Sequence, residues 1–162
     1  MQYKDQLVLT GMINDVGAYT RTNVPDSYRT GIELQGGYIF SKWLNAVANV
    51  SFSRNKIKAF TEYLDDYDAN WESIGQHTVT HNKTDIAFSP SVTGGATITI
   101  LPVKNLEFDL LSKYVGSQYL DNTQNEARKL NAFYTQDARV ILTLKNKLFN
   151  EWNIIEIGRA HI

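Results

Sequence analysis

Apolar residues occupy every second position of this chain for ten or more residues at a time, in several separate stretches. The clearest stretch places Leu44, Ala46, Ala48, Val50 and Phe52 between mostly polar residues. Because successive side chains of a β-strand point to opposite faces, this stretch forms a strand with one apolar and one polar face. Strands of soluble proteins average about 5–6 residues, whereas a tilted strand needs about 9–11 residues to cross a bilayer. The alternation predicts an all-β protein with the long antiparallel strands of a transmembrane β-barrel.

The same pattern predicts about seven strands, the last of which begins near the C-terminus. They are expected over residues 2–10, 28–41, 43–58, 86–101, 106–120, 132–145 and from 152 onward. Short turns are expected near residues 41, 103 and 148, and long polar linkers over residues 11–27, 59–85 and 121–131. Transmembrane barrels have short periplasmic turns at one end and longer extracellular loops at the other, so this asymmetry favours a barrel over a soluble sandwich.

The polar face of the expected strands is too polar for a packed core. An unpaired charge that points into an apolar interior costs several kcal/mol. We therefore expect the apolar face to contact lipid and the polar face to line a wet lumen. The expected lumen-facing residues are Glu33, Asn45, Asn49, Glu107, Asp109, Lys113, Asp137 and Arg139.

Composition excludes several classes of function. The net charge of −1 gives no electrostatic reason to bind nucleic acid or an anionic surface. The chain has no cysteine, which excludes disulfides, thiol catalysis and cysteine-ligated metal sites and fits the bacterial periplasm and outer membrane. No apolar run approaches the roughly 18 residues of a membrane helix. The first residues carry Asp5 where a signal peptide has its apolar core, so we expect Met1 to be an internal methionine of a longer protein.

Five aromatic residues lie in or beside the expected outer loops. Aromatic rings stack on sugar faces and fill peptide pockets, so these residues are candidate ligand contacts. They are Tyr19, Tyr63, Tyr67, Trp71 and Tyr119, and Trp71 lies deepest in a long linker. The alternative is that they pack within the loops or belong to an interfacial aromatic belt.

Two clusters with metal-ligand chemistry fail the spacing test. The acidic residues Asp65, Asp66, Asp68 and Glu72 do not match a calcium-binding loop, and a solvated acidic loop is the simpler interpretation. His77 and His81 have a zinc spacing only in a helix, and the residues between them favour a strand. Glu107, Asp109 and Asp137 are not accompanied by an apolar pocket that would raise the pKa of one carboxyl group, as the acid of a glycosidase requires. We therefore expect no catalytic residues, no metal and no cofactor.

Several stretches, in order, resemble the late barrel region of TonB-dependent outer-membrane receptors. The nearest type is the Bacteroidetes nutrient-uptake group, SusC/RagA-like, which handles glycans and peptides. The similar stretches are YKDQLVLTG, INDVGAYTRTNVPDSYRTGIEL, WLNAVANVSFSRNKIKAFTEYLDDYD, AFSPSVTGGATITILPVKNLEFDLLSKYVGSQYLDNTQNEARKLNAFYTQDARV and KNKLFNEWNI. The resemblance implies a barrel of about 22 strands around an N-terminal plug domain, of which this chain supplies roughly the last third. It also implies outer-membrane lipid, TonB and a surface lipoprotein as partners of the full-length protein.

The resemblance divides the chain at residue 155. Residues 1–155 are expected to be part of the barrel, which in isolation forms an open curved sheet. Residues 156–162 read EIGRAHI, depart from the family and resemble translated sequencing-adapter DNA, so we expect them to be non-native. Three alternatives remain open: a soluble carbohydrate-binding β-sandwich, a plug-less outer-membrane porin and an outer-membrane barrel enzyme.

Overall fold

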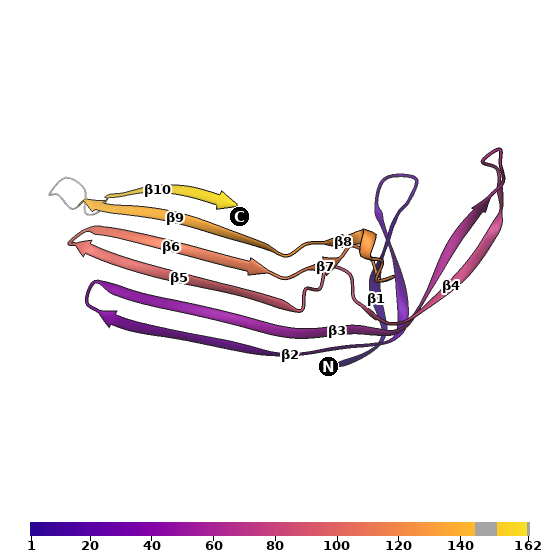
Figure 1. Ribbon diagram of the computed structural model, residues 1–162, viewed down its shortest axis with the longest axis horizontal. Coiled ribbons are helices and arrows are strands. Elements are labelled where there is room, and N and C mark those ends of the chain that lie inside the picture. The colour runs from indigo at the N-terminus through magenta and orange to yellow at the C-terminus, as the bar shows by residue number, and fades with distance from the viewer. Residues whose placement is uncertain (145–151, 162) are drawn as a thin grey trace. The chain divides into compact units, whose positions relative to one another are not determined.

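The computed structural model describes residues 1–144 and 152–161, without the side chains of residues 9–13, 19 and 161. Apart from one short 3₁₀ helix, η1 (Glu126–Arg128), the regular elements of this part of the chain are β-strands. The strands are β1 (Gln2–Ile13), β2 (Tyr19–Ser41), β3 (Leu44–Tyr67), β4 (Ser73–Asp85), β5 (Val92–Val103), β6 (Leu106–Val115), β7 (Gln118–Tyr119), β8 (Lys129–Leu130), β9 (Phe133–Leu144) and β10 (Trp152–His161). The prediction of an all-β protein is confirmed (Figure 1).

The main sheet is antiparallel wherever its register is described and runs in the order β1-β2-β3-β5-β6-β9-β10. β4 pairs with the C-terminal part of β3. Over the described ranges β1 and β10 each pair with one neighbour only, so the sheet is open. A separate ribbon joins β7 to β8. The chain forms two compact units: unit 1 holds residues 1–31, 53–91 and 117–131, and unit 2 holds residues 32–52, 92–116 and 132–162.

Unit 2 contains the regular part of the sheet, in which β5, β6, β9 and β10 run side by side (Figure 1). One row of directly opposed residues shows the register: Asn49 on β3 faces Gly95, Gly95 faces Lys113, and Lys113 faces Thr135. Because strand side chains alternate, this register puts the odd-numbered residues of these strands on one face and the even-numbered residues on the other. The end of β5 is an exception, because a register shift after Ile100 brings Val103 opposite Leu106.

The even-numbered face of unit 2 is apolar. Its members on β3, β5, β6, β9 and β10 are Leu44, Ala46, Ala48, Val50, Phe52, Val92, Gly94, Ala96, Ile98, Ile100, Leu106, Phe108, Leu110, Ser112, Tyr114, Tyr134, Gln136, Ala138, Val140, Leu142, Leu144, Trp152, Ile154, Glu156, Gly158 and Ala160. Much of this surface is uncovered: Ile98 is 40% exposed and Trp152 is 55% exposed. Contiguous apolar surface of this extent marks an interaction site with protein or membrane.

The odd-numbered face carries seven of the eight residues that we expected to line a lumen. They are Asn45, Asn49, Glu107, Asp109, Lys113, Asp137 and Arg139. Glu33 is exposed on β2. The alternation read from the sequence therefore gives the correct division of these strands into two faces, and the identity of the polar face as a lumen stays a prediction.

Unit 1 differs from the expected long linkers. Residues 11–27 and 59–85 are mostly strand: β1 pairs with β2 and β3 pairs with β4, and the turns between them span only residues 14–18 and 68–72. The sequence pattern missed this because the β3–β4 hairpin is polar on both faces, which removes the apolar alternation on which the prediction depends. Val8, Val24, Ile57, Phe60 and Ile86 form the small core of unit 1.

Two expected strands are shorter than predicted. The strand expected over 86–101 begins only at Val92, because Pro90 has no N–H for a ladder and Phe88 has a φ of 52°. The strand expected over 106–120 leaves the ladder at Gly116. A Cβ on Gly116 would lie 3.0 Å from the Val92 carbonyl oxygen, so the close approach at this bend favours glycine. The short turns at 42–43 and 104–105 agree with the prediction, and the turn expected near 148 lies outside the described residues.

Residues 156–161 continue β10 against β9. The alternation of apolar and polar side chains is interrupted over residues 155–157. Ile155 and Ile157 fall on the polar face, whereas Glu156 falls on the apolar face opposite Val140. From Gly158 the usual alternation returns, with Arg159 on the polar face opposite Asp137 and Ala160 on the apolar face opposite Gln136. The expectation that residues 156–162 are non-native stays a prediction.

Candidate functional site

An ion pair stands at the centre of the polar face of unit 2. Asp109 on β6 is 1% exposed and lies directly opposite Arg139 on β9. Arg139 donates from Nε and Nη2 to Asp109 Oδ2 at 2.9 and 2.6 Å, and Thr99 Oγ1 on β5 donates to Oδ1 at 2.7 Å. Three neighbouring strands thus hold one carboxylate, which fixes their register on this face.

A groove of about 880 Å³ lies on the same face, towards the loop end of the strands. Its floor is the row Asn49, Gly95, Lys113 and Thr135, with further threonines at positions 93 and 97. Asp137 and Arg159 form one wall and are joined by two hydrogen bonds of 2.7 and 2.9 Å. Val47, Leu111, Val115 and Phe133 add apolar surface to the lining.

The apolar face has aromatic residues at both ends. Tyr114 and Tyr134 lie directly opposite each other at the loop end, and Trp152 lies opposite Leu144 at the turn end. Three polar residues of this face are joined to each other, since the Tyr134 hydroxyl lies 2.9 Å from Ser112 Oγ and also contacts Gln136 Oε1. A face that contacts lipid has to satisfy its polar groups internally in this way.

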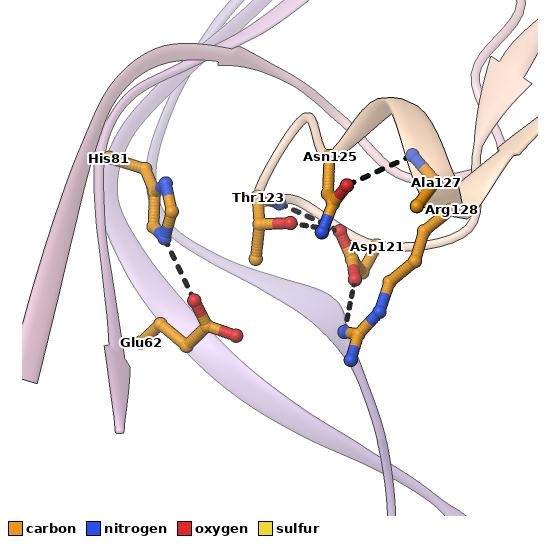
Figure 2. A network of polar contacts seen from close by, with 7 residues as sticks. All are labelled: Glu62, His81, Asp121, Thr123, Asn125, Ala127 and Arg128. Carbon is orange, nitrogen blue, oxygen red and sulfur yellow. Dashed lines mark hydrogen bonds and ion pairs between the residues drawn. The ribbon is translucent and has the colours of Figure 1, made fainter. Parts of the chain in front are cut away.

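The segment after β6, residues 117–131 of unit 1, contains a buried carboxylate that accepts several hydrogen bonds (Figure 2). Asp121 is 1% exposed and accepts hydrogen bonds from the backbone N–H and hydroxyl of Thr123 and from Arg128 Nη1, the last at 2.7 Å. Burial alone would raise the pKa of Asp121, but the hydrogen bonds from Arg128 and Thr123 outweigh it and lower the pKa. The neighbouring Asn122, fully buried, accepts from the backbone N–H of Ala87 at 2.8 Å and ties the segment to the strand connection before β5.

The β3–β4 hairpin carries cross-strand pairs on one face. His81 on β4 contacts Glu62 on β3 at 2.9 Å, and His77 contacts Asp66 at 2.8 Å (Figure 2 shows the first pair). The two histidines are thus on one strand, as the residues between them indicated, and each has its own carboxylate. Glu62 also acts on Arg128, whose pKa is raised first by the hydrogen bond and charge of Asp121 and then by the charge of Glu62. Sequence patterns do not predict these contacts, because the partners are far apart along the chain.

The candidate aromatic residues have different environments. Trp71 is 83% exposed at the tip of the β3–β4 hairpin, and its ring lies 6.3 Å from that of Tyr67. Tyr63 and Tyr67 are also exposed. Tyr119 is buried, its hydroxyl contacts Glu126 and Lys129 Nζ lies 5.2 Å from its ring centroid, so little of the ring is open to a ligand. The side chain of Tyr19 lies outside the described residues.

Acidic residues of the β3–β4 hairpin accept hydrogen bonds from other groups of the same hairpin. Asp68 Oδ1 accepts from the backbone N–H groups of Asn70 and Glu72 at 2.8 and 2.9 Å, and Asp65 contacts Gln76. Among the residues that the structure describes, no three histidine or acidic side chains come together as metal ligands would. In the same part of the chain, no helix has the length and apolar character needed to cross a membrane.

Comparison with known proteins gives no relative for this chain. No family model, no curated protein and no solved structure matches it. The function therefore has to be argued from the residues and the two faces of the sheet.

Proposed function

We propose that this chain forms part of the wall and outer loops of a transmembrane β-barrel in the outer membrane of a Gram-negative bacterium. The full-length protein would be a TonB-dependent transporter that imports a nutrient such as a glycan or peptide. The proposal of a membrane barrel rests on the apolar face of unit 2. The proposal of TonB-dependent import rests on the sequence resemblance alone, with the plug domain, TonB and a surface lipoprotein as the expected partners.

The spacing of the aromatic residues on the apolar face carries the membrane proposal. Leu144, which is opposite Trp152, follows Tyr134 by ten positions along β9. At about 3.4 Å per residue this distance is about 34 Å along the strand, or about 24 Å along the membrane normal at a tilt of about 45°. The apolar band of an outer-membrane barrel is about 25 Å tall and is flanked by aromatic girdles. The face between these aromatic residues has the height of that band.

The soluble β-sandwich is the alternative of a different class. It requires a second sheet over the apolar face, yet Phe108, Leu110 and Leu144 remain about two-fifths exposed in the described residues. A porin without a plug would share the wall described here and differs only in the rest of the full-length protein.

Lipid contact can be tested residue by residue, because the chain has no cysteine of its own. Single cysteines at Ile98 and Leu110 on the apolar face, and at Thr97 and Leu111 on the polar face, would each carry a bimane fluorophore. The chain would be refolded into phosphatidylcholine vesicles with and without bromine atoms on the lipid tails. Leu110 and Leu111 are a matched pair, since both are leucines of β6 on opposite faces.

We expect brominated lipid to quench the fluorophore at positions 98 and 110 and to leave positions 97 and 111 unquenched. Quenching without this alternation, or a cooperatively unfolding monomer that is soluble without lipid, would contradict the membrane barrel. The second result would make the sandwich the leading interpretation.

A further inference from the structure

We propose that a basic surface on unit 1 binds the phosphate headgroup of an anionic membrane lipid, with Arg54 as its main contact. The basic surface consists of Arg54, Lys56 and Lys58 on β3 and Lys4 on β1, all of which belong to unit 1. The inference rests on the proposed function, because it needs a layer of lipid headgroups beside β3. It deepens that function by naming the headgroup chemistry and the residues that recognise it.

The even-numbered positions of β3 change in character along the strand. They are apolar from Leu44 to Phe52. The next three are basic: Arg54, Lys56 and Lys58. Side chains at every second position share one face of a strand, and Arg54 to Lys58 covers about 14 Å of that face at about 3.4 Å per residue. A strand that leaves the apolar band after Phe52 therefore carries three cations into the headgroup layer, where long basic side chains are favourable.

The residues between these cations are buried, which directs the cations outward. Asn55 is 8% exposed and Ile57 is fully buried. The carbonyl oxygen of Asn55 accepts a hydrogen bond from the backbone N–H of Ile86 at 3.1 Å, so this face of β3 is covered by the chain itself. Arg54 and Lys58 are both exposed on the other face. Packing on one face of β3 thus presents the basic residues on the opposite face.

Two of the lysines have a carboxylate neighbour. Lys56 Nζ lies 2.8 Å from Asp85 Oδ1, which is a close ion pair. Lys58 Nζ lies 3.7 Å from Asp26 Oδ2, and both side chains remain about half exposed. Asp26 also lies directly opposite Lys4 in the β1–β2 ladder, so one carboxylate is shared between two lysines.

Arg54 has no carboxylate of its own, and its guanidinium makes no hydrogen bond or ion pair with a described residue. The four cations of the basic surface exceed the two neighbouring carboxylates, Asp26 and Asp85, by two charges. The next acidic residue along β3, Glu62, contacts His81 instead. The net charge of −1 therefore does not describe this surface. The planar N–H donors of a guanidinium match two oxygens of a phosphate group, which makes a phosphate headgroup the fitting occupant.

The test measures whether anionic lipid is enriched beside Arg54. Phe52→Cys, two positions before Arg54 on β3, would carry a bimane fluorophore in the full chain, in vesicles that mix phosphatidylglycerol with phosphatidylcholine. Bromine atoms are placed on the tails of one lipid or the other, and the ratio of quenching gives the relative binding constant of the two lipids. One cation at a membrane surface changes binding about five-fold, so we expect about a five-fold preference for phosphatidylglycerol. A fluorophore at Ile98→Cys is the control and should show a ratio near one.

Three further variants of the Phe52→Cys chain separate recognition from a general effect of charge. Arg54→Gln should lower the preference about five-fold. Lys104→Gln removes the same charge from the β5–β6 turn and should leave the preference unchanged. Asp26→Asn removes the carboxylate beside Lys58 and should increase the preference. Added sodium chloride should weaken the preference, because exposed charges are screened.

A quenching ratio near one at position 52, or a preference that survives Arg54→Gln or is lost in Lys104→Gln, would overturn the proposal. Loss of the preference in inorganic phosphate, but not in sodium chloride of equal ionic strength, would assign the surface to free phosphate and would also overturn it. A ratio near one in a chain that passes the lipid-quenching test at Ile98 and Leu110 would leave the membrane barrel standing without this lipid site. A preference that persists in a chain that fails that test would support the basic surface and count against the barrel.

Discussion

Glu156 lies directly opposite Val140 in the β9–β10 ladder, on the face that carries apolar residues on each preceding strand of unit 2. Residues 152–154 follow the pattern: Trp152 and Ile154 fall on the apolar face, and Asn153 falls on the polar face, where Thr143 Oγ1 lies 2.8 Å from its Oδ1. Ile155 departs from it and falls on the polar face. A charged residue on a lipid-facing strand is destabilising to a degree that depends on its depth. The change of pattern begins at Ile155, one residue before EIGRAHI.

The first prediction concerns this residue. Glu156→Val should raise the free energy of unfolding of the chain in vesicles by about 1–2 kcal/mol, because a carboxylate leaves the face that we propose to contact lipid. Urea unfolding followed by tryptophan fluorescence measures the change. Asn153→Val, on the polar face of the same strand, is the control and should give no gain. A Glu156→Val variant that is no more stable than the parent would show that lipid does not reach this part of β10.

The second prediction concerns the ion pair of Asp109 and Arg139. Arg139→Leu leaves Asp109, 1% exposed, without its charged partner and should cost about 3–5 kcal/mol of unfolding free energy. The double variant Asp109→Val with Arg139→Leu should recover most of that loss, since no buried charge remains. Urea unfolding of the parent, the two single variants and the double variant gives the coupling energy. Additive losses would mean that the two side chains do not act as a pair.

The third prediction concerns Asp121 in the segment after β6. Asp121→Asn keeps the shape of the side chain but removes the charge that Arg128 and Thr123 contact. Hydrogen bonds to a charged group contribute about 1.5–3 kcal/mol, so amide exchange of Thr123 should become about tenfold faster or more. Hydrogen exchange with mass spectrometry measures this effect. Amides of β9 serve as the reference and should not change, and equal acceleration in both places would indicate general destabilisation.

The same carboxylate predicts a pH dependence for this segment. The pKa of Asp121 is lowered in the fold, since the hydrogen bonds from Arg128 and Thr123 outweigh burial, and that of Glu126 is lowered by Tyr119 and Lys129. A lowered pKa contributes stability above the unfolded value, about 3.9 for aspartate and 4.3 for glutamate, and the contribution is lost as the pH falls through the folded value. Protection of the segment, corrected for intrinsic exchange rates, should therefore decrease below about pH 4. Asp121→Asn should remove most of this decrease, and an unchanged profile would contradict the assignment.

The sequence predicts unit 2 far better than unit 1, for a physical reason. In unit 2 one face is apolar and the other polar, so the period of two is visible in the residues themselves and assigns Asn49, Lys113 and Arg139 to one face. In the β3–β4 hairpin, residues such as Tyr63 and Thr78 lie opposite each other with polar neighbours on both faces, and stability comes from cross-strand contacts. Those contacts depend on a register that the sequence does not specify.

The sequence pattern does not predict the burial of Asp121 either. It depends on Arg128, seven residues on, and on the contact of Asn122 with Ala87, 35 residues away. Residues 121–131 have the polar composition of a solvated linker, and that composition does not distinguish an exposed aspartate from one that is enclosed by its own loop. Local pattern therefore assigns the faces of the strands but not the internal order of the loops.

The last prediction concerns the surroundings of Trp71 in unit 1 and Trp152 in unit 2. Trp71 is 83% exposed at the hairpin tip, whereas Trp152 lies on the apolar face of unit 2. In single-tryptophan variants of the chain in vesicles, with phenylalanine at the other two positions, aqueous iodide should quench Trp71 strongly and brominated lipid should not. Trp152 should show the opposite preference, because it lies at the boundary of the expected apolar band. Lipid quenching of Trp71 would place the hairpin at the membrane surface and would contradict its assignment as an outer loop.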